Sequence, residues 1–198
     1  IGIVGKYGAQ VQALLKKAAG LDIKTICPLH GPVLKDNLNY YIEKYLTWSS
    51  YEPEDDGILV ACASIHGNTK AAALKMVDIL KENGYEKVAF TDLTRDDMAE
   101  AVEDAFRYGK LILATTTYNG DIFPFMKEFI NHLTERNYQN RMIGFVENGS
   151  WTPMAAKIMK AAFEKSKNIT FADTTVTIRS AVDETSEAQI AALAKEMK

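Results

Sequence analysis

The hexapeptide Ser64-Ile65-His66-Gly67-Asn68-Thr69 decides the expected fold. It stands between the apolar run 58–63, typical of a buried strand, and an alanine-rich pattern of helical period that begins near Lys70. In an α/β sheet, a loop between a strand and the following helix can bind phosphate, because backbone N–H groups, hydroxyl groups and the positive helix end converge there. We therefore predict a phosphate-binding loop over 64–69.

The loop differs from the two common nucleotide-binding motifs. A P-loop places Gly-Lys-Ser/Thr at its end, whereas Gly67 is followed by Asn68-Thr69, and the loop is not a Gly-x-Gly-x-x-Gly turn. A hydroxyl-rich loop without a phosphate-binding lysine suits a phosphate that is held and not transferred, such as that of FMN. The alternative is an ordinary strand-to-helix turn with Thr69 as the N-cap.

Composition limits the classes of function. With 198 residues, 47% of them hydrophobic, the chain can bury one full core and carry an appendage. The chain has 23 basic and 26 acidic residues, and the basic residues are not clustered in the sequence, so we expect no nucleic-acid partner. Cys27 and Cys62 lie in apolar runs and predict buried thiols in a reducing cytoplasm. No stretch reaches the roughly 18 apolar residues of a membrane span, and no signal peptide is apparent.

A polar, acidic stretch over 51–57 predicts an exposed linker between two segments. After it, five strand-like runs alternate with helical patterns near 69–83, 96–107, 123–136, 153–166 and 184–197. This alternation predicts a parallel sheet covered by helices on both faces. The strand-like runs are Ile58–Ala63, Val88–Thr91, Leu111–Thr115, Met142–Val146 and Thr174–Ile178.

The segment before the linker is too small to be a domain by itself. Its pattern predicts a short helix over 11–19, a strand over 23–26 and an amphipathic helix over 36–48 with Asp36 near the N-cap. The chain begins with Ile1 inside an apolar pattern and without an initiator methionine, which indicates a piece of a longer protein. We expect this segment to pack on the second segment, on a partner or on absent sequence.

Loops after the third and fourth predicted strands carry groups suited to a flat conjugated ring. Ligands of open α/β sheets lie beyond the carboxyl ends of the strands, and both loops combine a glycine, polar groups and an aromatic side chain. Either loop alone could be a plain turn with a surface aromatic, but three such loops at successive strands favour a flavin site. The expected FMN-binding residues are Ser64, Ile65, His66, Gly67, Asn68, Thr69, Thr116, Thr117, Tyr118, Asn119, Gly120, Asn148, Gly149, Ser150 and Trp151.

The whole chain resembles the C-terminal part of flavodiiron proteins, also called A-type flavoproteins. The Ser-x-x-Gly-Asn-Thr phosphate loop of that family matches at 64–69, and its Thr-Tyr-Asn stretch, which leads to Phe-Pro, matches at 117–124. Upstream, Pro28-Leu29-His30-Gly31-Pro32-Val33 resembles the end of the family's diiron domain, where the histidine of His-Gly-Pro is the last iron ligand.

This resemblance implies a flavodoxin-like α/β three-layer sandwich with a five-stranded parallel sheet of order 2-1-3-4-5. It implies that 1–50 is the end of a metallo-β-lactamase-like diiron domain, 51–57 a linker and 58–198 the FMN-binding domain. FMN would pass electrons to a diiron site that reduces O2 to water or NO to N2O. The donor would be rubredoxin or an NADH-linked reductase, and the parent would be a head-to-tail homodimer.

Several positions depart from the family's pattern. Thr116 replaces a proline, and 147–151 replaces Gly-Ser-aromatic-Gly-Trp, so Glu147 would make the flavin harder to reduce if its carboxylate faced N1. His66 could donate to the phosphate or face solvent. The family's His-x-Glu-x-Asp-His cluster is absent, so we expect His30 to bind iron only in the full-length parent.

Two other functions fit the expected fold. A stand-alone NAD(P)H or quinone reductase is disfavoured by the upstream His-Gly-Pro motif. A receiver-like regulatory domain would need acidic residues at the ends of the first and third strands, where Ser64 and Thr116 stand. No residue is a good candidate for a general acid or base, so we expect an electron-transfer module without catalytic residues of its own.

Overall fold

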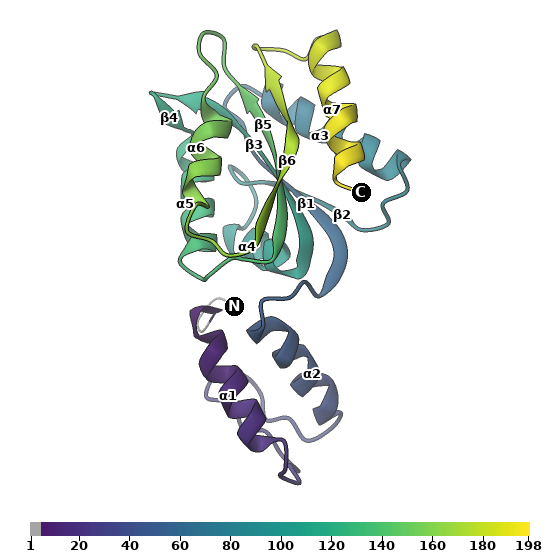
Figure 1. Ribbon diagram of the computed structural model, residues 1–198, viewed down its shortest axis with the longest axis vertical. Helices are drawn as coiled ribbons and strands as arrows, with labels where there is room; N and C mark the ends of the chain where they lie inside the picture. Colours follow the sequence, from purple (N-terminus) through teal and green to yellow (C-terminus); the bar gives the residue numbers. More distant parts are fainter. Residues whose placement is uncertain (1–4) are drawn as a thin grey trace.

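A computed structural model describes residues 5–198. Figure 1 shows an α/β domain and, at one end of it, a pair of helices formed by the start of the chain. That pair contains α1 (Gly8–Ala18), preceded by the short helix η1 (Gly5–Tyr7), and α2 (Leu38–Ser49). No helix within 5–198 combines the length and the apolar composition needed to cross a membrane.

The α/β domain alternates strands and helices as the sequence predicts. Its elements, in chain order, are β1 (Asp55–Ala63), α3 (Asn68–Glu82), β2 (Val88–Asp92), α4 (Met98–Arg107), β3 (Tyr108–Tyr118), β4 (Asp121–Ile122), α5 (Pro124–Thr134), β5 (Arg141–Asn148), α6 (Ala155–Ala162), β6 (Ile169–Ile178) and α7 (Glu184–Glu196). The strand β1 therefore begins inside the stretch 51–57 that we expected to be a linker.

Five parallel strands form the sheet in the order β2-β1-β3-β5-β6. Counted over these five strands, this is the predicted order 2-1-3-4-5, and the predicted flavodoxin-like fold is confirmed. The sheet also contains β4, which we did not predict and which pairs antiparallel with the end of β3. Asn119 and Gly120 form the two-residue turn between them with φ of 50° and 72°, the left-handed conformation that such hairpins require.

The sheet is the middle of three layers. Helices α3 and α7 pack on one face, and α4, α5 and α6 pack on the other (Figure 1). Side chains of β1 alternate between the two faces: Leu59 belongs to the core under α4, α5 and α6, whereas Val60 belongs to the core under α3 and α7. Every residue from Ile58 to Ala63 is fully buried, which explains why β1 reads as a continuous apolar run.

The helices α1 and α2 pack against each other at the start of the chain. The Gln12 side chain on α1 donates to the Leu46 carbonyl and to the Ser49 hydroxyl on α2, at 3.0 and 2.7 Å. The predicted strand over 23–26 is wrong, because only an isolated antiparallel bridge joins Ile26 to Leu34. The N-cap of α2 is Asn37 in a left-handed conformation, one residue after the expected Asp36.

The two cysteines lie in different surroundings. Cys62 is fully buried in β1, and burial raises the pKa of its thiol to about 12. Cys27 is exposed, so the expectation of a buried thiol is wrong at that position. The apolar run around Cys27 lies in a loop of the small N-terminal segment, which has too few residues to enclose it.

A buried arginine fastens the N-terminal segment to the domain. Arg141, 3% exposed, donates to the Tyr51 carbonyl at 2.6 Å and to the Phe106 carbonyl at 2.5 Å. The Tyr51 hydroxyl accepts from the Gly8 N–H and donates to the Gly5 carbonyl, at 3.1 and 2.7 Å. Burial lowers the pKa of Arg141, and its two terminal nitrogens donate to carbonyl groups from both parts of the chain, whereas its buried Nε has no hydrogen-bond partner.

Replacing Arg141 by alanine is expected to lower the free energy of unfolding by about 3 kcal/mol, because several buried carbonyl groups lose their donor. Urea denaturation measures this loss. The control is Arg107→Ala, which removes a half-exposed ion pair with Asp55 and should cost less than about 1 kcal/mol. Equal losses in the two variants would contradict the role of Arg141.

Candidate cofactor site at the carboxyl edge of the sheet

The loop 64–67 leads from β1 directly into the first turn of α3. The N–H groups of residues 68, 69 and 70 lie in that turn, where an α-helix offers no acceptor of its own. Gly67 is the N-cap, with φ of +93°, and a Cβ added to it would meet no atom within 4 Å. The space beside Gly67 is therefore open. The Gly67 N–H donates to the Ser64 hydroxyl at 3.1 Å, and the N–H groups of residues 68–70 have the chemistry that a phosphate requires.

Thr69 adds a hydroxyl group to this set of donors. Thr69 is 3% exposed, and its Oγ1 accepts a hydrogen bond from the Asn148 side chain at 3.3 Å. Among residues 5–198 the Thr69 hydroxyl donates to no acceptor, although such a group can always donate one proton. A phosphate oxygen in the loop would accept that proton, so the residues present fit the phosphate of FMN. Thr69 is not the N-cap of α3, because Gly67 holds that position.

The loop itself has no cation, and the lysine that follows it is already engaged. The Lys70 ammonium donates to the Asp92 carboxylate at the end of β2, at 2.9 Å. The other oxygen of Asp92 accepts from the N–H and the hydroxyl of Thr94, at 3.1 and 2.6 Å. Burial alone would raise the pKa of the Asp92 carboxyl, but the hydrogen bonds from Thr94 and Lys70 outweigh it and lower that pKa below its usual range.

The second predicted loop is mostly strand, because residues 116–118 end β3 and Asp121 begins β4, and only Asn119 and Gly120 form a turn. The Thr116 hydroxyl donates to the Asn148 carbonyl at 3.1 Å, and the Thr117 hydroxyl accepts from the Met154 N–H at 3.0 Å. Both contacts hold β3, β5 and the start of α6 together, but only Thr116 uses its proton, and the Thr117 hydroxyl donates to no acceptor among residues 5–198. Tyr118 is half-exposed and meets Phe123 edge-on, with the ring centroids 5.5 Å apart.

In the third predicted loop, the Glu147 carboxylate is held by the scaffold. One of its oxygens accepts from the Ala156 N–H in the first turn of α6 at 2.9 Å, and the other accepts from the Thr177 hydroxyl on β6 at 3.0 Å. Glu147 is 8% exposed. The Glu147 carboxylate therefore points to the N-terminal end of α6. We expected Glu147 to make the flavin harder to reduce only if its carboxylate faced the flavin, and these contacts do not support that orientation.

The rest of the third loop brings its backbone close to neighbouring segments. The Gly149 N–H donates to the Ile178 carbonyl at 3.0 Å. A Cβ at Gly149 would lie 3.1 Å from the Cα of Pro153, which leaves little room for a side chain. Ser150 is exposed, and Trp151 is 96% exposed, so its indole is free to stack on a ligand.

A fourth loop, which we did not predict, joins the same edge after β6. Ser180, with φ of 73°, exchanges two hydrogen bonds with the Asn148 side chain, at 3.0 and 3.1 Å. The hydroxyl groups of Ser150 and Ser180 lie 2.9 Å apart. This loop has no glycine or aromatic residue to attract notice, and its position after the fifth parallel strand was the only signal in the sequence.

The histidines do not form a metal site in the described structure. His66 is exposed at the tip of the 64–67 loop. His30 lies in an exposed loop of the N-terminal segment, next to Gly31 with φ of 123°. Residues 5–198 contain no group of three or more His, Cys, Asp or Glu side chains that could hold a metal ion.

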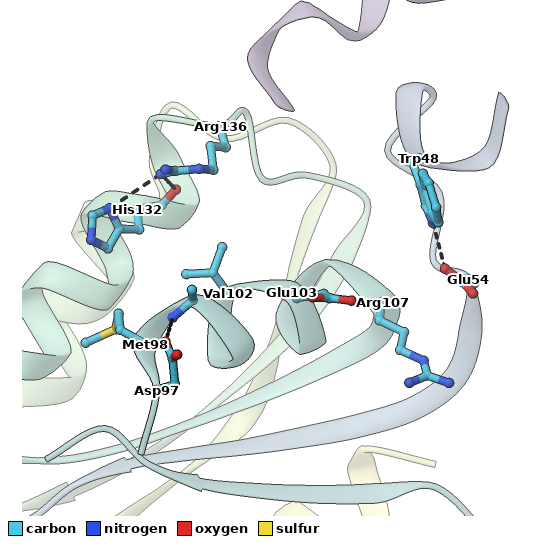
Figure 2. A pocket seen from close by; sticks show the side chains of 10 residues that line it. Trp48, Glu54, Asp97, Met98, Val102, Glu103, Arg107, His132 and Arg136 are labelled. Atoms are coloured by element: carbon cyan, nitrogen blue, oxygen red, sulfur yellow. Dashed lines mark hydrogen bonds between the residues drawn. The ribbon is translucent and has the colours of Figure 1, made fainter. Parts of the chain in front are cut away.

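A hollow of about 850 Å³ lies away from this edge, between α2, α4 and α5. Figure 2 shows Trp48 bonded to Glu54 on one side of it, and His132 with Arg136 on the other. None of the expected cofactor residues is among those that line it, which are Trp48, Glu54, Asp97, Met98, Ala99, Val102, Glu103, Arg107, His132 and Arg136.

The strand order and the loops at the carboxyl edge define a flavodoxin-like α/β protein. No family model matches the sequence. The chain is 22% identical over 155 residues to the anaerobic nitric oxide reductase flavorubredoxin of Klebsiella pneumoniae, across 75% of this chain and 32% of the relative. It matches the rubredoxin oxygen:oxidoreductase of Desulfovibrio gigas with a TM-score of 0.90 and 17% identity. For the flavodiiron protein of Giardia intestinalis the TM-score is 0.85 and the identity 20%.

The likeness covers 99% of this chain and 49% of each of these two solved chains. The resemblance to the C-terminal half of flavodiiron proteins is thus confirmed in the fold, and it includes the N-terminal helices as well as the flavodoxin-like domain. The chain spans about a third of the flavorubredoxin and about half of the solved flavodiiron chain.

Asp92→Asn tests the ionised carboxylate beside the loop. Folding lowers the pKa of Asp92. Its charge therefore stabilises the fold at any pH above the ordinary pKa of about 4, and this contribution is lost as the pH falls through the lower pKa of the folded state. We expect the variant to lose about 1–2 kcal/mol at pH 7 and the difference from wild type to shrink below about pH 4. Urea denaturation across pH 7 to 3 measures this, and a difference that is constant with pH would contradict it.

Proposed function

We propose that this chain is the FMN-binding electron-transfer module of a flavodiiron-type oxidoreductase, whose diiron site reduces O2 to water or NO to N2O. The observation that carries the proposal is the buried Thr69 hydroxyl, which has a proton to donate at the open first turn of α3. Two exposed aromatic side chains lie at the same edge on neighbouring strands: Tyr118 is the last residue of β3, and Trp151 follows β5. The fold of flavodiiron proteins supports the same assignment.

The loop 64–69 would hold the FMN phosphate, and the loops 116–121 and 147–151 would flank its ring. FMN, when bound, supplies one-electron transfer. The protein contributes neutral hydrogen-bond donors for the phosphate and aromatic planes for the ring. Because Tyr118 and Trp151 are exposed, a ring held between their loops would lie near the surface, where partners can reach it. No side chain at this edge is required to transfer a proton.

The N-terminal segment fits the end of a preceding domain. We assign 1–50 to a metallo-β-lactamase-like diiron domain, 51–57 to the linker, whose last three residues already belong to β1, and 58–198 to the FMN domain, with His30 as an iron ligand only in the full-length protein. Leu14, Leu21 and Leu29 are 61%, 68% and 98% exposed, and such side chains on one small segment are suited to contact with a larger domain.

The partners follow from the same proposal. The donor would be rubredoxin or an NADH-linked reductase, because the matched proteins include a rubredoxin oxygen:oxidoreductase and a flavorubredoxin. A head-to-tail homodimer in the cytoplasm would bring the flavin of one subunit to the iron of the other.

The first test is the absorption spectrum of the purified chain before and after addition of FMN, followed by reduction with dithionite. Bands near ~370 and ~450 nm that bleach on reduction are expected of a bound flavin cofactor. The absence of both bands and titratable binding would overturn the proposal. Oxidation of NAD(P)H by the chain alone would instead favour a stand-alone reductase.

Thr69→Val is expected to weaken FMN binding by about 10- to 100-fold, because one hydrogen bond to a charged phosphate is lost while α3 remains. A fluorescence titration measures the affinity. The matched control is Thr134→Val on α5, whose hydroxyl donates to the Ile130 carbonyl and lies on a different element from the loop. Unchanged affinity in Thr69→Val, or an equal loss in the control, would contradict the phosphate site.

A further inference from the structure

The side chain of Asn148, at the end of β5, is held in one orientation. It is 7% exposed, and its amide faces the peptide of Ser180. The Oδ1 atom accepts from the Ser180 N–H at 3.1 Å, and the Nδ2 atom donates to the Ser180 carbonyl at 3.0 Å. A reversed amide would set donor against donor and acceptor against acceptor, so the peptide determines which atom is the nitrogen.

The same nitrogen also determines what the Thr69 hydroxyl can do. Nδ2 of Asn148 donates to Oγ1 of Thr69 at 3.3 Å. An amide nitrogen has no lone pair to offer, so the hydroxyl can only accept from it and must donate its own proton elsewhere. No other side chain or backbone group among residues 5–198 bonds to that hydroxyl.

Thr69 is itself in the first turn of α3, beside N–H groups that lack helical acceptors. We propose that Asn148 is a positioning residue for the phosphate of FMN: its amide occupies the acceptor side of the Thr69 hydroxyl and so makes that hydroxyl a donor to the phosphate. This inference rests on the proposed function. It changes the role that we predicted for Asn148, from direct contact with FMN to action through Thr69.

The inference predicts different FMN affinities for Asn148→Ala, which removes the amide, and Asn148→Asp, which replaces it by a hydrogen-bond acceptor. Asn148→Ala frees the Thr69 hydroxyl to rotate, but the hydroxyl still has a proton for the phosphate. Asn148→Asp places a carboxylate oxygen near that hydroxyl, and the carboxylate accepts the proton that the phosphate would otherwise receive. It also adds a negative charge near the phosphate. FMN affinity should therefore decrease from wild type to Asn148→Ala and further to Asn148→Asp.

The experiment titrates the chain and its variants with FMN and with riboflavin, which has the same ring but no phosphate. We expect Asn148→Ala to weaken FMN about 3- to 10-fold and Asn148→Asp at least about 30-fold, within the range of a hydrogen bond to a charged group. Riboflavin affinity should stay within about threefold of wild type for both. The matched amide control is Gln189→Ala on α7, whose side chain accepts from the Thr177 N–H and should leave both affinities unchanged.

A double-mutant cycle tests whether Asn148 acts through Thr69. In a Thr69→Val background, Asn148→Ala should change FMN affinity by less than about twofold, because the hydroxyl that it positions is gone. A penalty that persists in full, or a riboflavin loss equal to the FMN loss, would overturn the inference while leaving the proposed function intact. A wild-type chain that binds neither ligand would overturn both.

Discussion

The burial of β1 on both faces is the constraint on which the rest of the structure depends. A strand paired with parallel neighbours, as β1 is with β2 and β3, cannot be joined to them by a tight turn, so the chain must cross over through a helix. The crossover after β1 is α3, which begins within five residues of the last strand position. The unsatisfied N–H groups of that helix are thereby brought to the carboxyl edge. The candidate phosphate site is thus a consequence of packing the core.

The polar groups at this edge divide into those that hold the scaffold and those that remain for a ligand. Thr116 and Glu147, which the sequence places in binding loops, lie at the ends of β3 and β5, and their side chains bond to a neighbouring strand and to the start of α6. Thr69 and Trp151 retain a free donor and a free ring face. Residue type alone does not separate the two groups, because a hydroxyl or carboxylate is equally suited to both tasks.

Sequence patterns predicted the parallel strands, because burial on both faces produces continuous apolar runs. The order of the strands followed from the resemblance to flavodiiron proteins. The patterns did not predict β4, whose two residues give no periodic signal and depend on the Asn119-Gly120 turn. The expected strand over 23–26 failed because its apolar residues have only the single bridge to Leu34 and no sheet to join. Sequence patterns also did not predict the direction of the Glu147 side chain or the role of the loop at Ser180, since both depend on which strands become neighbours.

The site would hold its phosphate largely with neutral donors, since Lys70 is engaged by Asp92. Without a cation in the loop, selectivity for phosphate depends on the direction of each N–H and O–H group more than on long-range attraction. Direction in turn requires rigid support, and Asn148 supplies it by joining the end of β5, the first turn of α3 and the loop after β6. The predicted role of the edge therefore depends on contacts between loops that are distant in sequence, and the order of the parallel strands is what brings those loops together.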